Sequence, residues 1–142
     1  MKFCFIIFFL LISILSYGQE TKKADNILGT YRTANKDAKV KIFKKNGNYY
    51  GKVIWLRDPL DQSGKPILDK NNPIQSKRTK PLLNLILISN LSYKNGEWVG
   101  GTIYDPKNGK SYDCILWLEN GDLKVRGYVG WFFDTKTWKK LN

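Results

Sequence analysis

Residues 94–128 read KNGEWVGGTIYDPKNGKSYDCILWLENGDLKVRGY. Apolar and polar residues alternate through runs at 97–104, 111–118 and 123–130, which is the pattern of half-buried β-strands. Turns rich in asparagine and glycine separate the runs, and Asn-Gly steps favour tight hairpins because both residues tolerate a positive φ. The stretch therefore predicts antiparallel strands that pair with their neighbours along the chain.

The same rhythm continues on both sides of this stretch. Five further runs, at residues 29–32, 39–44, 49–56, 85–93 and 135–141, bring the number of expected strands to eight. Eight strands in an antiparallel up-and-down meander can bury both sheet edges by closing into a barrel. We therefore expect an all-β fold made of a single barrel of this kind. A β-sandwich and a shorter OB-like barrel remain alternatives.

One segment, residues 57–84, breaks the rhythm. It contains four of the five prolines, which cannot donate to a strand ladder, so we expect a long loop there. Long loops in compact domains are commonly functional. The acidic and amide residues of this loop invite a calcium interpretation, but their spacing does not fit an EF-hand, and we expect no metal site.

The N-terminus has the three parts of a secretory signal peptide. Lys2 provides the positive charge, an apolar run follows, and small residues precede Gln19. We expect residues 1–18 to be removed, residues 19–26 to form a flexible lead-in, and residues 27–142 to form the barrel. The mature chain would then have no transmembrane segment and would lie in the periplasm or outside the cell. A retained N-terminal anchor is the alternative.

Composition excludes several classes of function. The 142 residues include no histidine, which removes histidine-dependent triads and histidine-ligated zinc, and two cysteines cannot form a disulfide framework. We name no catalytic residue and expect no cofactor. The net charge is +12, but arginine is scarce among the 24 basic residues, so we expect no nucleic-acid partner. The charge suits anionic envelope polymers or lipid headgroups better.

Several motifs resemble one bacterial family. The run WVGGTIYDP at 98–106 with GKSY at 109–112 is similar to the secreted family known as domain of unknown function 2147. Other matching motifs are GTY at 29–31, GKVIW at 51–55, Asp69 with Asn72 and Pro73, LKVRGY at 123–128, and Thr137 with Trp138. The resemblance implies a small lipocalin-like barrel in the bacterial envelope. It implies no reaction, because the family has no established activity.

The lipocalin-like expectation gives Tyr31 a role. The Gly-Thr-Tyr motif at 29–31 resembles the Gly-x-Trp element that opens lipocalin barrels, in which an aromatic ring plugs the closed end beneath a cation. Tyrosine replaces tryptophan here, and the cation could be Lys139 or Lys140 on the last strand. This element belongs to the fold and not to catalysis.

The candidate ligand site combines strand ends with the long loop. Its expected members are Tyr104, Asp105, Tyr112, Arg126, Asp69 and Asn72. We expect Tyr112 to face Tyr104 across a hairpin, which also has a purely structural interpretation as an aromatic pair. Arg126 shares an alternating face with Lys124, which favours a solvated position, whereas a turn toward the cavity would make it an anion clamp.

Two classes of function remain. The favoured one is non-enzymatic binding of a small hydrophobic or anionic ligand, or of an envelope component, inside the barrel. The alternative is an enzyme that uses carboxylate and tyrosine chemistry at the barrel mouth.

Overall fold

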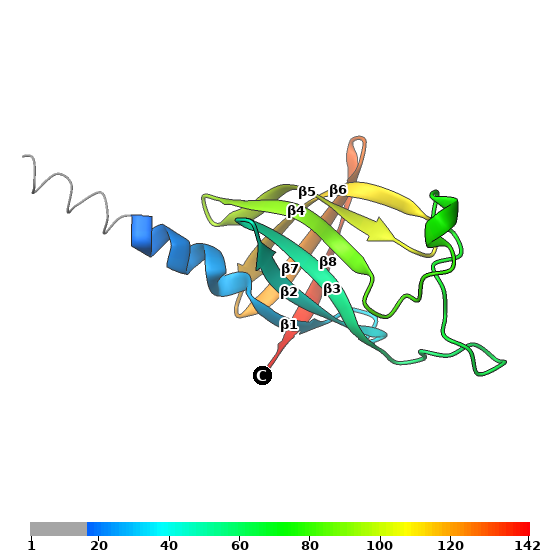
Figure 1. Ribbon diagram of the computed structural model, residues 1–142. Coiled ribbons are helices and arrows are strands. Elements are labelled where there is room, and N and C mark those ends of the chain that lie inside the picture. The colour runs from blue at the N-terminus through cyan, green and yellow to red at the C-terminus, as the bar shows by residue number, and fades with distance from the viewer. Residues whose placement is uncertain (1–16) are drawn as a thin grey trace, which may run out of the picture.

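The computed structural model describes residues 17–142, so residues 1–16 of the expected signal peptide lie outside the described part. The strands are β1 (Gly29–Arg32), β2 (Ala38–Lys45), β3 (Asn48–Leu56), β4 (Ile86–Lys94), β5 (Glu97–Asp105), β6 (Lys110–Glu119), β7 (Asp122–Val129) and β8 (Phe132–Leu141). Each strand pairs antiparallel with the next, and β1 also pairs with β8, which closes the barrel (Figure 1). The expected eight-stranded up-and-down barrel is confirmed, and the sandwich and OB-like alternatives are wrong.

The hairpin turns have the chemistry that the sequence indicates. Asn46, Asn95 and Asn120 have φ values of 51°, 51° and 52°, and a glycine with positive φ follows each of them. Two consecutive positive φ values match the twist of the adjoining strands, so each Asn-Gly step joins its strands tightly. The turns therefore set the order of the strands locally.

The closed end of the barrel is filled by a hydrophobic core. Buried side chains from every strand meet there, among them Tyr31, Tyr49, Leu91, Trp98, Leu116 and Leu123. The Tyr31 hydroxyl donates to the Ile27 carbonyl at 2.8 Å, and the Lys140 ammonium lies 5.9 Å from the centre of the Tyr31 ring. Burial raises the pKa of Tyr31 to about 12. Of the two lysines considered for the plug, Lys140 is the cation over the ring.

The segment before β1 differs from the expected lead-in. Residues 17–24 are helical and continue into a 3-10 turn, η1 (Asp25–Ile27), at one end of the barrel (Figure 1). Ala24 is buried, and its carbonyl accepts a hydrogen bond from the Trp98 indole at 3.0 Å. Residues 19–26 were expected to form a flexible lead-in, but Ala24 within them packs into the core, where the Trp98 indole needs an acceptor. Within residues 17–142 no helix is long and apolar enough to cross a membrane.

Asp25 attaches this segment to the barrel. Its carboxylate accepts a hydrogen bond from the Tyr49 hydroxyl at 2.6 Å and forms an ion pair with Lys44 at 2.9 Å. The hydrogen bond from Tyr49 and the one from Lys44 lower the pKa of Asp25. These contacts hold the segment before β1 over the closed end of the barrel. The segment therefore does not cover the opposite end.

The long loop between β3 and β4 lies at that opposite end (Figure 1). It contains a short 3-10 turn, η2 (Gln75–Lys77), and two isolated antiparallel bridges, Leu60 with Pro66 and Leu68 with Pro81. Each bridge contains a proline, and because proline has no backbone N–H to donate, neither bridge extends into a longer ladder. The loop is therefore ordered without becoming a regular strand, as the prolines predict.

Cys114 belongs to the core. Its side chain is a free, buried thiol on β6, paired in register with Gly101 on β5 and Gly127 on β7. Desolvation by burial, together with the charge of Asp113, raises the pKa of the thiol to about 12. The side chain acts as a small apolar group.

Candidate functional site

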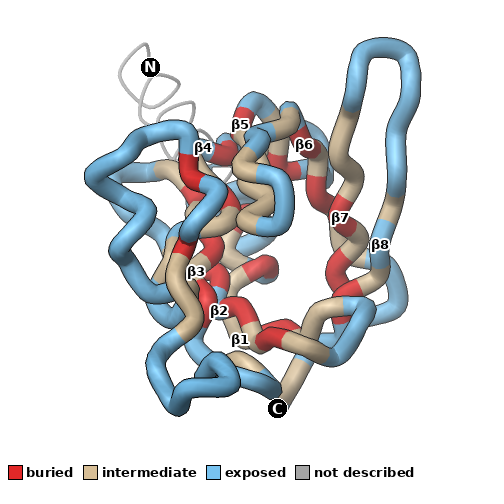
Figure 2. The backbone as a smooth tube through the Cα atoms, turned by 90° about the vertical axis from the view of Figure 1, so that its right-hand side faces the viewer, coloured by how far each residue is buried: buried red, intermediate tan, exposed pale blue. Residues whose placement is uncertain are grey.

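A large cavity occupies the end of the barrel beneath the long loop. Its volume is about 910 Å³, which falls within the range of small-molecule sites. The apolar residues of its wall come from strands and loop alike and include Val53, Leu56, Ile67, Leu82, Leu85, Leu87, Ile103, Val125, Val129 and Trp138. Figure 2 views the barrel from this end, and its red segments show that buried residues occur all around the ring of strands. The cavity can hold an apolar ligand of moderate size.

Gly127 gives the cavity part of its width. This glycine lies on the inward face of β7 between Val125 and Val129, and all three residues line the cavity. A Cβ atom built on Gly127 would lie no closer than 3.8 Å to any neighbour, at ordinary van der Waals distance. A Cβ atom therefore fits at this position, and because Gly127 lines the cavity, a larger side chain would extend into it.

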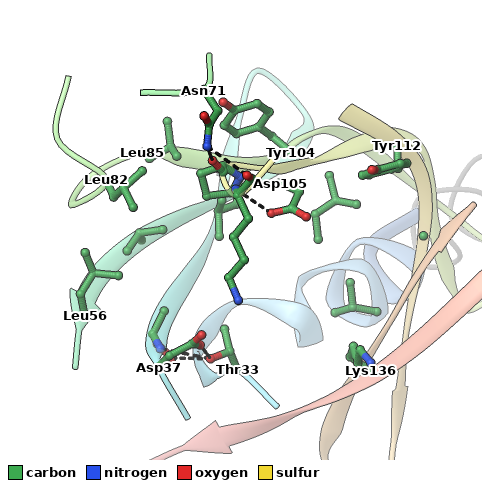
Figure 3. Close-up of a pocket in the computed structure, with 18 of the residues that line it drawn as sticks. Thr33, Asp37, Leu56, Asn71, Leu82, Leu85, Tyr104, Asp105, Tyr112 and Lys136 are labelled. Atoms are coloured by element: carbon green, nitrogen blue, oxygen red, sulfur yellow. Dashed lines mark hydrogen bonds between the residues drawn. The ribbon is translucent and has the colours of Figure 1, made fainter. Parts of the chain in front are cut away.

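Polar side chains gather at the mouth of the cavity (Figure 3). The acids of the mouth already have donors. Asp37 accepts from the Thr33 hydroxyl at 2.6 Å, and Asp105 accepts from the backbone N–H of Lys107 at 2.9 Å. Asp58 pairs with Arg57 at 3.1 Å, and Asp134 pairs with Lys136 at 2.9 Å.

Two lysines at the mouth, unlike these acids, have no partner of opposite charge within ion-pair distance among the described residues. Lys70 and Lys107 both line the cavity, and neither forms an ion pair with any described residue. Lys70 comes from the long loop and Lys107 from the turn between β5 and β6. An anionic group at the cavity mouth would therefore meet two cations that are in no close ion pair with a described residue.

A buried polar cluster fixes the long loop beside the cavity. The Tyr104 hydroxyl donates to Asp69 at 2.6 Å, and the Asn72 side-chain amide donates to the other oxygen of the same carboxylate at 2.7 Å. Asp69 and Asn72 are both buried. Desolvation, followed by the hydrogen bond to Asp69, raises the pKa of Tyr104 to about 12. Both side-chain oxygens of the buried Asp69 thus accept hydrogen bonds, which offsets the cost of burying a polar group.

A second contact fixes the loop to the turn between β5 and β6. The Asn71 side-chain amide donates to the carbonyl oxygens of Pro106 and Lys107 at 3.1 and 3.0 Å (Figure 3). Gly109 has a φ of +72°, and a Cβ atom there would lie 1.9 Å from the Asn71 carbonyl oxygen. The loop and the turn can approach this closely only because Gly109 has no side chain.

The structure brings most of the expected site together. Tyr104, Asp105 and Tyr112 line the cavity. Asp69 does not line it but accepts the hydrogen bond of Tyr104, and Asn72 in turn donates to Asp69. The expected pairing of Tyr112 with Tyr104 is wrong by one position, because Tyr112 pairs with Ile103 and Tyr104 pairs with Ser111. The four-residue turn of residues 106–109, flanked by the pair Asp105 and Lys110, sets this register. Tyr112 instead accepts a hydrogen bond from the Asn108 amide at 2.8 Å.

Arg126 is not part of this group. Its guanidinium carbon lies 4.9 Å from the Trp117 ring centre and 4.3 Å from that of Phe133, and its Nε donates to the Thr135 hydroxyl at 2.8 Å. Strand alternation places it on the face opposite to the cavity-lining neighbours Val125 and Gly127. Arg126 therefore does not line the cavity, and its expected place at the mouth is wrong.

Several lining residues were not expected from the sequence. They are Thr33 and Asp37 from the β1–β2 connection, Lys70 from the long loop, Lys107 from the β5–β6 turn and Gly127 from β7. The alternation along β7 was an available signal, since it puts Gly127 on the face opposite to Arg126. The loop and turn residues carried no comparable signal, because their contacts depend on how two segments dock.

Comparisons with known proteins agree with this architecture. Residues 29–140 match a family described as uncharacterized proteins conserved in bacteria (DUF2147). The chain belongs to this family. Family membership confirms the resemblance noted in the sequence and spans the barrel from β1 to β8.

A solved structure shows the same fold. Protein HP1028 from the human pathogen Helicobacter pylori, described as belonging to the lipocalin family, is 27% identical to this chain. The similarity covers 82% of this chain and 83% of that one, with a TM-score of 0.70. No curated protein matches the sequence. The DUF2147 chain is therefore a lipocalin-like barrel, a fold consistent with the binding of small ligands.

Proposed function

We propose that this protein binds a small amphiphilic molecule, with the apolar part inside the barrel and an anionic head at the mouth. The observation that carries the proposal is the cavity of about 910 Å³, whose apolar wall ends in a polar mouth. Buried apolar area would provide most of the affinity, and a few polar groups would orient the ligand.

The charges at the mouth support an anionic head over a cationic one. Each acid there has an internal donor, whereas Lys70 and Lys107 have no ion-pair partner among residues 17–142. A carboxylate, sulfonate or phosphate could accept hydrogen bonds from either ammonium group. No observation on the described residues favours the carboxylate and tyrosine enzyme that the sequence left as the alternative.

Filling the cavity tests the proposal. In Gly127→Phe the Cβ atom fits without backbone strain and the ring extends into the cavity, so the barrel should fold while the ligand volume is lost. We expect the variant to bind dodecanoate and 1-anilinonaphthalene-8-sulfonate at least about tenfold more weakly than the parent, a loss of about 1.4 kcal/mol or more. Fluorescence titration measures the affinity, and circular dichroism checks the fold. Unchanged affinity in a folded variant would contradict binding in the cavity.

A comparison of head groups tests the role of the lysines. We expect the double variant Lys70→Ala/Lys107→Ala to bind dodecanoate about tenfold more weakly, since each charge-assisted hydrogen bond contributes about 1.5–3 kcal/mol when it is shielded from water and less at an open mouth. Binding of dodecanol should not change. Lys94→Ala, at the β4–β5 turn near the N-terminal helix, is the matched control. Equal losses for the acid and the alcohol would count against an anionic head.

We also propose that the protein acts outside the cytoplasm. The support is the sequence of residues 1–18, with Lys2, an apolar run and small residues before Gln19. N-terminal sequencing of the protein purified from the producing bacterium should begin at or near Gln19. Recovery of the chain from the cytoplasmic fraction with Met1 or Lys2 at its N-terminus would contradict export.

A further inference from the structure

The turn between β7 and β8 exposes an unusual amount of apolar surface. Residues 129–133, which we call the aromatic tip, read Val-Gly-Trp-Phe-Phe. Trp131 is 98% exposed, Phe132 80%, and Val129 and Phe133 59% each. In Figure 2 this hairpin extends well beyond the wall of the barrel and is exposed along its outer part. Contiguous apolar surface of this kind usually marks an interaction site.

Side chains at the base of the β7–β8 hairpin pack against the aromatic tip. The Arg126 guanidinium packs on the Phe133 ring at 4.3 Å and is itself held by Thr135. Tyr128, which pairs in register with Phe133 across the hairpin, packs against the same ring, with ring centres 6.1 Å apart. Gly130 has a φ of +58°, which allows the tight turn that presents Trp131. The aromatic side chains therefore project from an ordered hairpin.

The tip is also continuous with the cavity. Val129, Phe132 and Phe133 line the cavity mouth as well as forming the exposed surface. Lys107 stands at the same mouth, without an ion-pair partner among the described residues. Apolar side chains thus extend from the end of the hairpin to the cavity, next to an available positive charge.

We propose that the aromatic tip docks the protein on an anionic lipid bilayer. Tryptophan and phenylalanine are well suited to the membrane interface, and basic groups nearby are attracted to anionic headgroups. A bilayer accepts a convex wedge of three aromatic rings without a preformed pocket, which a protein partner would have to supply. The proposal goes beyond ligand binding and does not require the cavity to be filled.

The net charge of the chain favours an anionic membrane over a second copy of this protein as the partner of the aromatic tip. Lys2 is the one basic residue outside the described range, and the remaining 23 basic residues face 12 acidic ones. The described residues form five ion pairs, which leaves most of the basic side chains without a partner. Two identical chains would repel each other, whereas an anionic membrane surface would attract each one.

Vesicle binding tests the proposal. The chain from Gln19 onward is used, because the barrel and its core lie entirely after this residue and the apolar N-terminus is left out. We expect it to sediment with vesicles of equimolar phosphatidylcholine and phosphatidylglycerol, and much less with phosphatidylcholine alone. The double variant Trp131→Ser/Phe132→Ser should partition about tenfold or more weakly, equivalent to about 1.4 kcal/mol. Trp55→Ser, on the wall of β3, is the matched control and should bind like the parent.

Fluorescence locates the contact. Brominated lipids should quench the Trp131 emission, and Trp131→Phe should keep vesicle binding while losing this quenching. The proposal is overturned if the parent does not bind anionic vesicles, if the double serine variant binds them as well as the parent, or if the tip substitutions instead dissolve a dimer seen in size-exclusion chromatography. Ligand affinity is measured separately on vesicle-free protein, so a failure of docking is distinguishable from a failure of ligand binding.

Discussion

Gly101→Ala is expected to lower the free energy of unfolding by about 1–3 kcal/mol or more, because a methyl group at this position overpacks the barrel. A Cβ atom on Gly101 would lie 2.3 Å from the Ser89 carbonyl oxygen and 2.9 Å from the Leu91 side chain. The closest atom belongs to the backbone of β4 and cannot rotate away. Urea denaturation monitored by tryptophan fluorescence measures the loss.

The matched control is Gly127→Ala, an inward-facing glycine on a neighbouring part of the same wall. Its Cβ atom would meet nothing closer than 3.8 Å. The alanine should leave stability unchanged or raise it by about 0.4–1 kcal/mol, since alanine reduces the entropy of the unfolded chain. If both variants unfolded at the same urea concentration, close strand approach would not be the reason for glycine at position 101.

Gly109→Ala is expected to release the long loop from the turn between β5 and β6. The alanine would be strained at a φ of +72°, at about 1–2 kcal/mol, and its Cβ atom would collide with the Asn71 carbonyl oxygen. The hydrogen bonds from Asn71 to Pro106 and Lys107 should then weaken. Hydrogen exchange should become faster at the amides of Asp69 and Asn72, which bond to Lys80 and Asp69 carbonyls in the native loop.

The variant Gly121→Ala is the control that introduces backbone strain without a steric collision. Gly121 has a φ of +82°, but its Cβ atom would have no neighbour within 4 Å. This variant should lose only the strain energy and should leave exchange in the long loop unchanged. Faster exchange at Asp69 in both variants would show that the effect is general loss of stability and not loss of loop docking.

The strand order of the barrel was predictable from local sequence. Asn46, Asn95 and Asn120 with their following glycines create tight hairpins whose geometry depends on residues adjacent in the chain. Strand alternation then indicates which side chains point inward, and closure follows because eight short strands otherwise leave two exposed edges. The resemblance to lipocalins also predicted that Tyr31 closes one end of the barrel beneath a lysine, and the structure places Lys140 over the Tyr31 ring.

The candidate site was predictable only in part. Tyr104, Asp105 and Tyr112 follow a recognisable motif and do line the cavity, but their pairing was misjudged because the register depends on the exact length of the β5–β6 turn. Arg126 was considered for the mouth although its alternation with Gly127 opposed this. The structure resolves the choice, because Arg126 packs on the rings of Trp117 and Phe133 and is absent from the residues that line the cavity.

By itself, the sequence determined the features that depend on near neighbours in the chain: the all-β class, the tight turns, the proline-rich loop and the basic charge. Only the tertiary structure decided which end of the barrel is open, how Asn71 docks over Gly109, and which lysines lack a partner at the mouth. The physical reason is the range of the interactions. Turn conformation and alternation depend on adjacent residues, whereas a cavity and its charges depend on side chains brought together from strands and loops far apart in the chain.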